Sequence, residues 1–113
     1  LRLGATGLRV AELCLGTMTF GEETGFSADR AESLRVYEGY VAAGGNFLDT
    51  ANMYTGGTSE RWLGEFARGH RERLVIASKY SLTTDGTDPN AGGNGRKALV
   101  QSLDASLRRL GMD

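Results

Sequence analysis

Short apolar runs alternate along the chain with longer segments in which apolar residues recur every three or four positions. Three of the runs are typical of β-strands, and they occupy Val10–Gly16, Asn46–Asp49 and Leu74–Lys79. The third run is apolar at every position from Leu74 to Ala77, which is typical of a strand buried on both faces. The pattern therefore predicts buried strands joined by helices.

Three amphipathic helices are predicted between and after these strands, over residues 27–43, 59–68 and 96–110. Ser27 is the expected N-cap of the first helix, and Gly44 is expected to end it. The apolar faces are formed by Leu34, Tyr37 and Val41 in the first helix, by Trp62, Leu63 and Phe66 in the second, and by Leu99, Leu103, Leu107 and Leu110 in the third. Before all of these elements, residues 1–10 surround a glycine-bearing turn and predict a small β-hairpin.

Strands and helices that alternate in this way are typical of βαβ units on a parallel sheet, and two architectures share the pattern. A doubly wound sheet binds its ligand at a glycine-rich first turn, whereas a (β/α)8 barrel places catalytic side chains at the carboxyl ends of several strands. Residues 93–98 match the dinucleotide pattern G-x-G-x-x-A, but they follow a polar stretch rather than a strand. Gly16 and Gly21 are spaced as in a phosphate loop, yet Glu22 stands where that loop needs lysine.

The composition is that of a globular protein, with 113 residues, 40% apolar and 24% charged. A net charge of -1 without long charge runs argues against nucleic acid and anionic membranes as partners. Cys14 is the only cysteine and His70 the only histidine, so a disulfide and a protein-built zinc site are both excluded, and a cytoplasmic setting is expected. The chain opens on Leu1 and stops directly after a predicted helix, so we expect it to be part of a longer protein.

Polar side chains break the apolar pattern where two strands end. Asp49 closes the second strand, Lys79 closes the third, and Tyr54 follows Asp49 by five residues. In a barrel all three would point into one mouth. The alternative is a structural ion pair between Asp49 and Lys79, with a tyrosine that only packs.

The three residue types suit the reduction of a carbonyl, which requires a proton donor where the oxygen gains negative charge. A tyrosine side chain has a reference pKa of about 10, so it is a poor acid near neutral pH unless a cation stabilises its phenolate. Lys79 could be that cation, and Asp49 would keep it charged and in place. The hypothesis is an electrostatic chain from Asp49 through Lys79 to Tyr54.

At these residues the chain resembles the aldo-keto reductases, barrel enzymes that reduce aldehydes and ketones with NADPH. The strongest match is at residues 46–54, which carry the family's catalytic Asp and Tyr and are followed by Gly57, Ser59, Glu60, Leu63 and Gly64. Residues 76–79 match the segment that carries the family's lysine. The other matching segments are residues 15–21 and 96–111. The resemblance implies an N-terminal hairpin (1–10) and the first three β/α units (11–113) of a single (β/α)8 TIM barrel that is incomplete in this chain.

The resemblance also implies roles for individual residues. Tyr54 would be the proton donor, with Lys79 and Asp49 tuning it. Gly16, Thr17 and Met18 would line the nicotinamide site of NADPH, where Asp49 would also contact the ribose. Phe20, Met53 and Tyr80 are candidates for the substrate pocket, with a core or rim role equally open, while Trp62 and Cys14 are expected to pack and His70 to be solvated.

The family's fourth catalytic residue is a histidine at the end of the fourth strand, and the chain stops before that strand. We therefore expect the 113 residues to be inactive alone and the longer parent to be the enzyme. One alternative is a non-catalytic, cofactor-sensing protein of the same fold; another is a complete small domain whose open sheet edges pair with a second copy. Whether the chain is part of a longer protein or complete, the apolar strand residues are expected to face the space of the missing strands or a partner chain. These residues are Phe47, Leu48, Val75 and Ile76.

Overall fold

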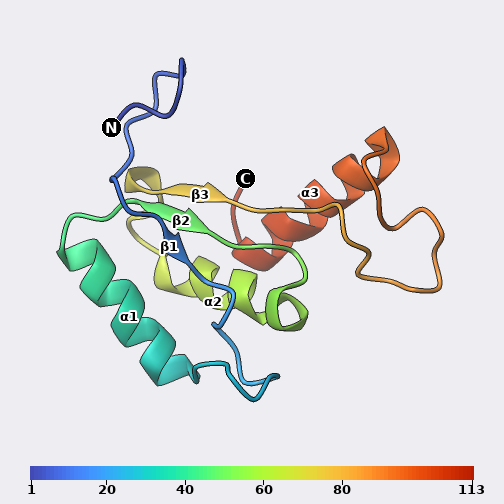
Figure 1. Cartoon of the computed structure of the whole chain (residues 1–113), viewed down its shortest axis with the longest axis horizontal. Helices are drawn as coiled ribbons and strands as arrows, with labels where there is room; N and C mark the ends of the chain where they lie inside the picture. Colours follow the sequence, from blue (N-terminus) through green and yellow to red (C-terminus); the bar gives the residue numbers. More distant parts are fainter.

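Three parallel strands lie side by side at the centre of the structure, a computed structural model that describes residues 1–113 (Figure 1). In Figure 1 α1 and α2 lie below the strands and α3 lies to their right. The strands are β1 (Leu15–Gly16), β2 (Phe47–Asp49) and β3 (Val75–Ala77); the α-helices are α1 (Arg30–Ala42), α2 (Thr58–Phe66) and α3 (Arg96–Leu110); and two short 3-10 turns are η1 (Tyr54–Gly57) and η2 (Arg71–Arg73).

The sheet has the order β1-β2-β3, and all of its pairs are parallel. Gly16 is paired with Asp49, and Asp49 with Ala77, so the carboxyl ends of the three strands form one row. The strands are shorter than predicted: β1 lacks residues 10–14 at its amino end, and β3 ends at Ala77. Beyond the row, single hydrogen bonds join the backbones. One of these runs from the Asn52 amide to the Lys79 carbonyl at 3.1 Å, so Lys79 lies two residues beyond β3.

The first helix begins differently from the prediction. Its N-cap is Asp29, whose carboxylate accepts a hydrogen bond of 2.8 Å from the Glu32 amide. The prediction of Ser27 was wrong because the Ser27 hydroxyl donates to the carbonyl of Thr24 instead, within the preceding turn. Ser27 and Asp29 both have side chains that can cap a helix, and the geometry of the turn before the helix decides which of them does.

The second and third helices follow the predicted pattern closely. The second begins one residue before the prediction and ends at Phe66, and the third has the predicted bounds, with Gly111 in the left-handed conformation after it at a φ of 64°. A long loop separates β3 from α3, so Gly93 does not follow a strand directly, as a dinucleotide turn requires. No helix has the length and apolar content needed to cross a membrane.

The core lies between the sheet and the first two helices. Its fully or largely buried members are Phe20, Tyr37, Leu48, Leu63, Phe66, Ala67, Leu74 and Leu110. The expectation that the strands' apolar residues face open space was wrong for Leu48, which is completely buried. Neighbouring strand residues point to opposite faces, so Phe47 and Asp49 lie on the face of the sheet away from Leu48. Both residues are half-buried there.

A close contact joins α2 and α3. A Cβ atom added to Gly64 would lie 2.0 Å from the carbonyl oxygen of Leu110, so only glycine allows the two helices to approach this closely. This contact fixes the end of α3 against the middle of α2.

The N-terminal hairpin is short and stands away from the sheet in Figure 1. Arg2 and Arg9 form an isolated antiparallel bridge, and the Leu3 amide donates to the Leu8 carbonyl at 3.0 Å. The side chain of Asn46, just before β2, holds the following segment by accepting from the Ala11 amide at 2.8 Å. The hairpin is therefore tied to the amino end of the sheet. The row of carboxyl ends formed by Gly16, Asp49 and Ala77 lies at the opposite end.

Three side chains were expected to have no chemical role, and the structure places one of them as predicted and two differently. Trp62 packs against the core as predicted. His70 was expected to be solvated, but it is half-buried and lies 2.6 Å from the hydroxyl of Tyr37, whose pKa burial raises to about 12. Cys14 was expected to pack, but it is exposed, because it alternates with Leu15 and so faces away from the helix layer.

Candidate active site

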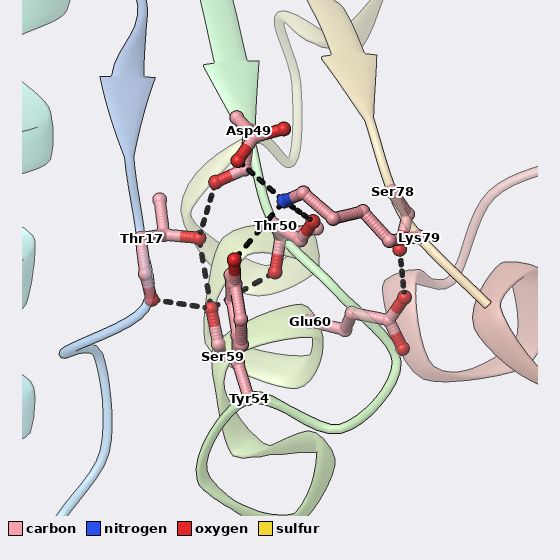
Figure 2. A network of polar contacts seen from close by, with 8 residues as sticks. All are labelled: Thr17, Asp49, Thr50, Tyr54, Ser59, Glu60, Ser78 and Lys79. Carbon is pink, nitrogen blue, oxygen red and sulfur yellow. Dashed lines mark hydrogen bonds and ion pairs between the residues drawn. The ribbon is translucent and has the colours of Figure 1, made fainter. Parts of the chain in front are cut away.

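Asp49, Tyr54 and Lys79 meet at the carboxyl end of the sheet (Figure 2). The Nζ atom of Lys79 lies 2.5 Å from Oδ2 of Asp49 and 3.1 Å from the hydroxyl oxygen of Tyr54. It also donates to the carbonyl oxygen of Thr50 at 2.8 Å. The prediction that these three side chains converge at one end of the sheet is therefore confirmed.

The ammonium group of Lys79 has three N–H donors, and these three contacts use all of them. The hydroxyl oxygen of Tyr54 accepts from Lys79, so the tyrosine's own proton is free to point elsewhere. This is the arrangement that a proton donor needs: a cation on the oxygen and a proton that is not already used.

The loop after β2 places the tyrosine. Tyr54 opens η1, and its amide donates to the Ala51 carbonyl at 3.2 Å. Thr55 has a positive φ of 47°, and its hydroxyl donates to the Phe20 carbonyl at 2.6 Å. A non-glycine residue in this conformation is uncommon, so the loop is held by its contacts rather than by local preference. The result is a ring whose centroid lies 4.8 Å from Nζ of Lys79.

The charge of Lys79 is stabilised where it lies. Partial burial lowers the pKa of Lys79, but the hydrogen bonds and the charges of Asp49 and Tyr54 outweigh this effect, and the pKa lies above its ordinary value. The Lys79 and Asp49 side chains are 49% and 37% exposed, so water screens the pair and it contributes little to stability. Lys79 is therefore cationic at neutral pH, beside a site that is open to solvent.

Behind the site lies a cluster of buried hydroxyl groups, the hydroxyl cluster, formed by Thr17, Thr50 and Ser59. The Ser59 hydroxyl lies 2.8 Å from that of Thr17 and 3.0 Å from that of Thr50. Thr17 also donates to the Asp49 carbonyl at 3.0 Å. Thr17, which is expected to line the nicotinamide site, is fully buried, and its side chain ties β1 and β2 to the start of α2.

A second buried network was not anticipated from the sequence. Glu60 is completely buried, accepts from the Ser78 hydroxyl at 2.7 Å and pairs with Arg109 at 2.6 Å. A signal was available, because Glu60 precedes Leu63 by three residues and so shares the buried face of α2. A charged residue in that position requires a partner inside the protein.

The other predicted site residues divide into exposed and buried ones. Gly16 has open space where a side chain would lie, and Met18 is exposed. Phe20 is buried in the core, so of the two roles left open for it the structure shows the core role. Met53 and Tyr80 line a cavity of about 150 Å³ together with Tyr54 and Lys79; the other residues that line it are Ala51, Asn52, Ser81 and Leu82. No group of three or more His, Cys, Asp or Glu side chains is placed to hold a metal ion.

Comparison with known proteins identifies the family. The sequence model of the Aldo/keto reductase family matches residues 12–113. The chain belongs to this family. Among its curated relatives, norsolorinic acid reductase stcV of Emericella nidulans is 43% identical over 95% of the chain, which covers 30% of that reductase. An aryl-alcohol dehydrogenase of Pestalotiopsis microspora is 36% identical over 96% of the chain, which covers 31% of the dehydrogenase.

Solved structures of the family share the fold. An aldo-keto reductase of Bacillus halodurans, in its holo form, superimposes with a TM-score of 0.84 at 27% identity. All of the present chain is covered, and it accounts for 36% of the Bacillus protein. The chain thus has an α/β fold like that of the aldo-keto reductases, with three parallel strands and three helices, and it spans about a third of the length of the proteins that it matches.

Proposed function

We propose that this aldo-keto reductase reduces an aldehyde or ketone to the alcohol by hydride transfer from NADPH, with Tyr54 as proton donor. In this proposal residues 1–113 are the N-terminal part of one (β/α)8 barrel: a hairpin cap (1–10) and the first three β/α units (11–113). The observation that carries the proposal is the contact of one ammonium group, on Lys79, with both the Asp49 carboxylate and the Tyr54 hydroxyl oxygen.

The proposed chemistry follows from those contacts. As hydride reaches the carbonyl carbon, negative charge develops on the oxygen, and a donor placed there lowers the barrier. Tyr54 gives its proton to that oxygen and is left as a phenolate. Lys79 stabilises the phenolate at the same 3.1 Å contact, while Asp49 keeps the ammonium in place on its other side.

The exposed residues at the strand ends fit the nicotinamide end of the cofactor, which supplies the hydride when bound. Above Gly16 a flat ring could approach the backbone without meeting a side chain. Met18 offers an exposed apolar contact, and Asp49 has a second carboxylate oxygen that could accept from a ribose hydroxyl. We propose that Thr17 supports this surface from inside through the hydroxyl cluster.

The substrate in this proposal is a small carbonyl compound that enters beside Tyr54. Met53 and Tyr80 flank the cavity next to the tyrosine and give it an apolar and aromatic lining. The names of two relatives, an aryl-alcohol dehydrogenase and norsolorinic acid reductase, support aromatic carbonyls as the first compounds to test. A cytoplasmic location stays a prediction.

The proposal predicts that the complete protein oxidises NADPH when given aromatic aldehydes and ketones, at rates well above those without substrate. Absorbance of the reduced nicotinamide measures the rate, and parallel assays with NADH measure the cofactor preference. Cofactor binding without oxidation across such a panel would contradict the proposed reduction and favour a cofactor-sensing protein.

A further inference from the structure

Glu60 is a buried carboxylate that takes no part in the proposed proton transfer. It lies at the start of α2, and each of its oxygens has a partner from a different element: Ser78 after β3 and Arg109 from α3. Replacing a buried ion pair by well-packed apolar groups often costs no stability, so stability alone is a weak reason for a charged pair at this point. Its position relative to Lys79 suggests another reason.

Ser78 and Lys79 are consecutive, and their side chains point in different directions in Figure 2. Lys79 reaches toward Asp49 and Tyr54, whereas Ser78 reaches toward Glu60 in the helix layer. These residues lie beyond the last ladder position of β3, so paired strands no longer define their backbone. The Asn52 amide gives one bond, to the Lys79 carbonyl at 3.1 Å, and the Ser78 hydroxyl gives the other anchor.

The carboxylate that receives Ser78 is itself held firmly. Arg109 pairs with it from α3, which the contact at Gly64 fixes against α2. The preceding residue, Ser59, joins the same turn of α2 to the ends of β1 and β2 through the hydroxyl cluster. Glu60 is thus fixed relative to Asp49, and a hydrogen bond to it fixes Ser78 in the same frame.

We propose that Glu60, held by Arg109, is a positioning residue that sets the place of Lys79 through its hydrogen bond with Ser78. This inference rests on the role proposed above for Lys79. Without the Ser78 anchor, the backbone of residues 78 and 79 would be held by one backbone bond, and the ammonium group would be displaced from Tyr54. A misplacement of about 1 Å in a catalytic group can lower a rate by up to about 10²-fold.

The test variant is Ser78→Ala in the complete reductase, because replacing Glu60 would also leave Arg109 without its partner and could unfold the protein. Ser78→Ala keeps the ion pair and removes only the anchor. We expect kcat to fall about tenfold and the Kd for NADPH to stay within twofold. Ser78→Thr, which keeps the hydroxyl, should restore most of the activity.

Ser102→Ala is the matched control, since Ser102 is a half-buried serine on α3 whose hydroxyl has no hydrogen-bond partner in the structure. A second readout does not need activity: titration of the Lys79 side-chain nitrogen by NMR. The contacts with Asp49 and Tyr54 hold the pKa of Lys79 above its ordinary value, so loosening them in Ser78→Ala should lower it. Ser102→Ala should leave it unchanged.

The outcomes separate the two proposals. If the unchanged protein reduces no carbonyl, the proposed function fails, and the Lys79 titration alone decides the positioning role. If Ser78→Ala matches Ser102→Ala in that titration, and in turnover where turnover exists, Glu60 does not position Lys79 and the inference is overturned.

Discussion

Replacing Tyr54 by phenylalanine in the complete protein should lower carbonyl reduction by about 10²-fold or more, the scale of a positioned general acid. The substitution keeps the ring beside Lys79 and removes only the hydroxyl that accepts from the ammonium at 3.1 Å. Because the hydroxyl is proposed to act on the substrate oxygen and not on the cofactor, the Kd for NADPH should change little. Steady-state turnover and cofactor titration measure the two quantities separately.

Tyr37→Phe is the matched control for this variant. It also removes a tyrosine hydroxyl, but one that is buried in the core and lies 2.6 Å from His70. That change should cost about 1 kcal/mol in the free energy of unfolding and leave turnover nearly unchanged. Ordinary turnover by Tyr54→Phe would show that another group donates the proton.

Lys79→Met should nearly abolish turnover at neutral pH, by about 10²-fold or more, because no cation then stabilises the phenolate of Tyr54. Lys79→Arg keeps the charge but changes its reach and geometry, so a small residual activity should remain. Neither change should unfold the protein, since the pair of Lys79 with Asp49 is partly exposed and contributes little to stability. Turnover from neutral to alkaline pH, together with the thermal midpoint, checks both expectations.

The other lysine of the chain provides the control. Lys97 lies 3.9 Å from Asp88 in an exposed ion pair on α3, away from the strand ends. Lys97→Met should therefore leave turnover as it is. If both Lys79 variants work as well as Lys97→Met, then Lys79 is only a structural partner of Asp49.

The location of much of the site could be predicted from the sequence, because it depends mainly on where the strands end. Buried parallel strands read as apolar runs, and the first polar residue after such a run lies at the carboxyl edge of the sheet. Asp49 is such a residue, and Lys79 follows its run by one further position, after Ser78. Because Asp49 is paired with Ala77, Lys79 comes two residues later at the same edge of the sheet. The convergence of Tyr54 with them depended on a loop; the barrel geometry placed it in the same mouth, and the family resemblance implied its role.

The remaining features depend on contacts between residues far apart in the chain. The pair of Tyr37 with His70 joins α1 to the turn before η2, and no local pattern reveals it. The same is true of Glu60 with Arg109, which are 49 residues apart. The burial of Thr17 was not anticipated for a related reason: the family resemblance implied a place at the nicotinamide site, whereas the alternation of residues along the strand turns its hydroxyl inward.

Deuterium transfer in the complete protein tests the central claim, that Asp49, Tyr54 and Lys79 form a carbonyl-reducing site, most directly. Reduced cofactor that carries deuterium at the hydride position is mixed with an aromatic aldehyde, and the alcohol is analysed by mass spectrometry and NMR over a single turnover. We expect one deuterium at the carbinol carbon, delivered about 10²-fold more slowly in Tyr54→Phe. Deuterium that never reaches that carbon, or that reaches it equally fast in Tyr54→Phe, would contradict this account.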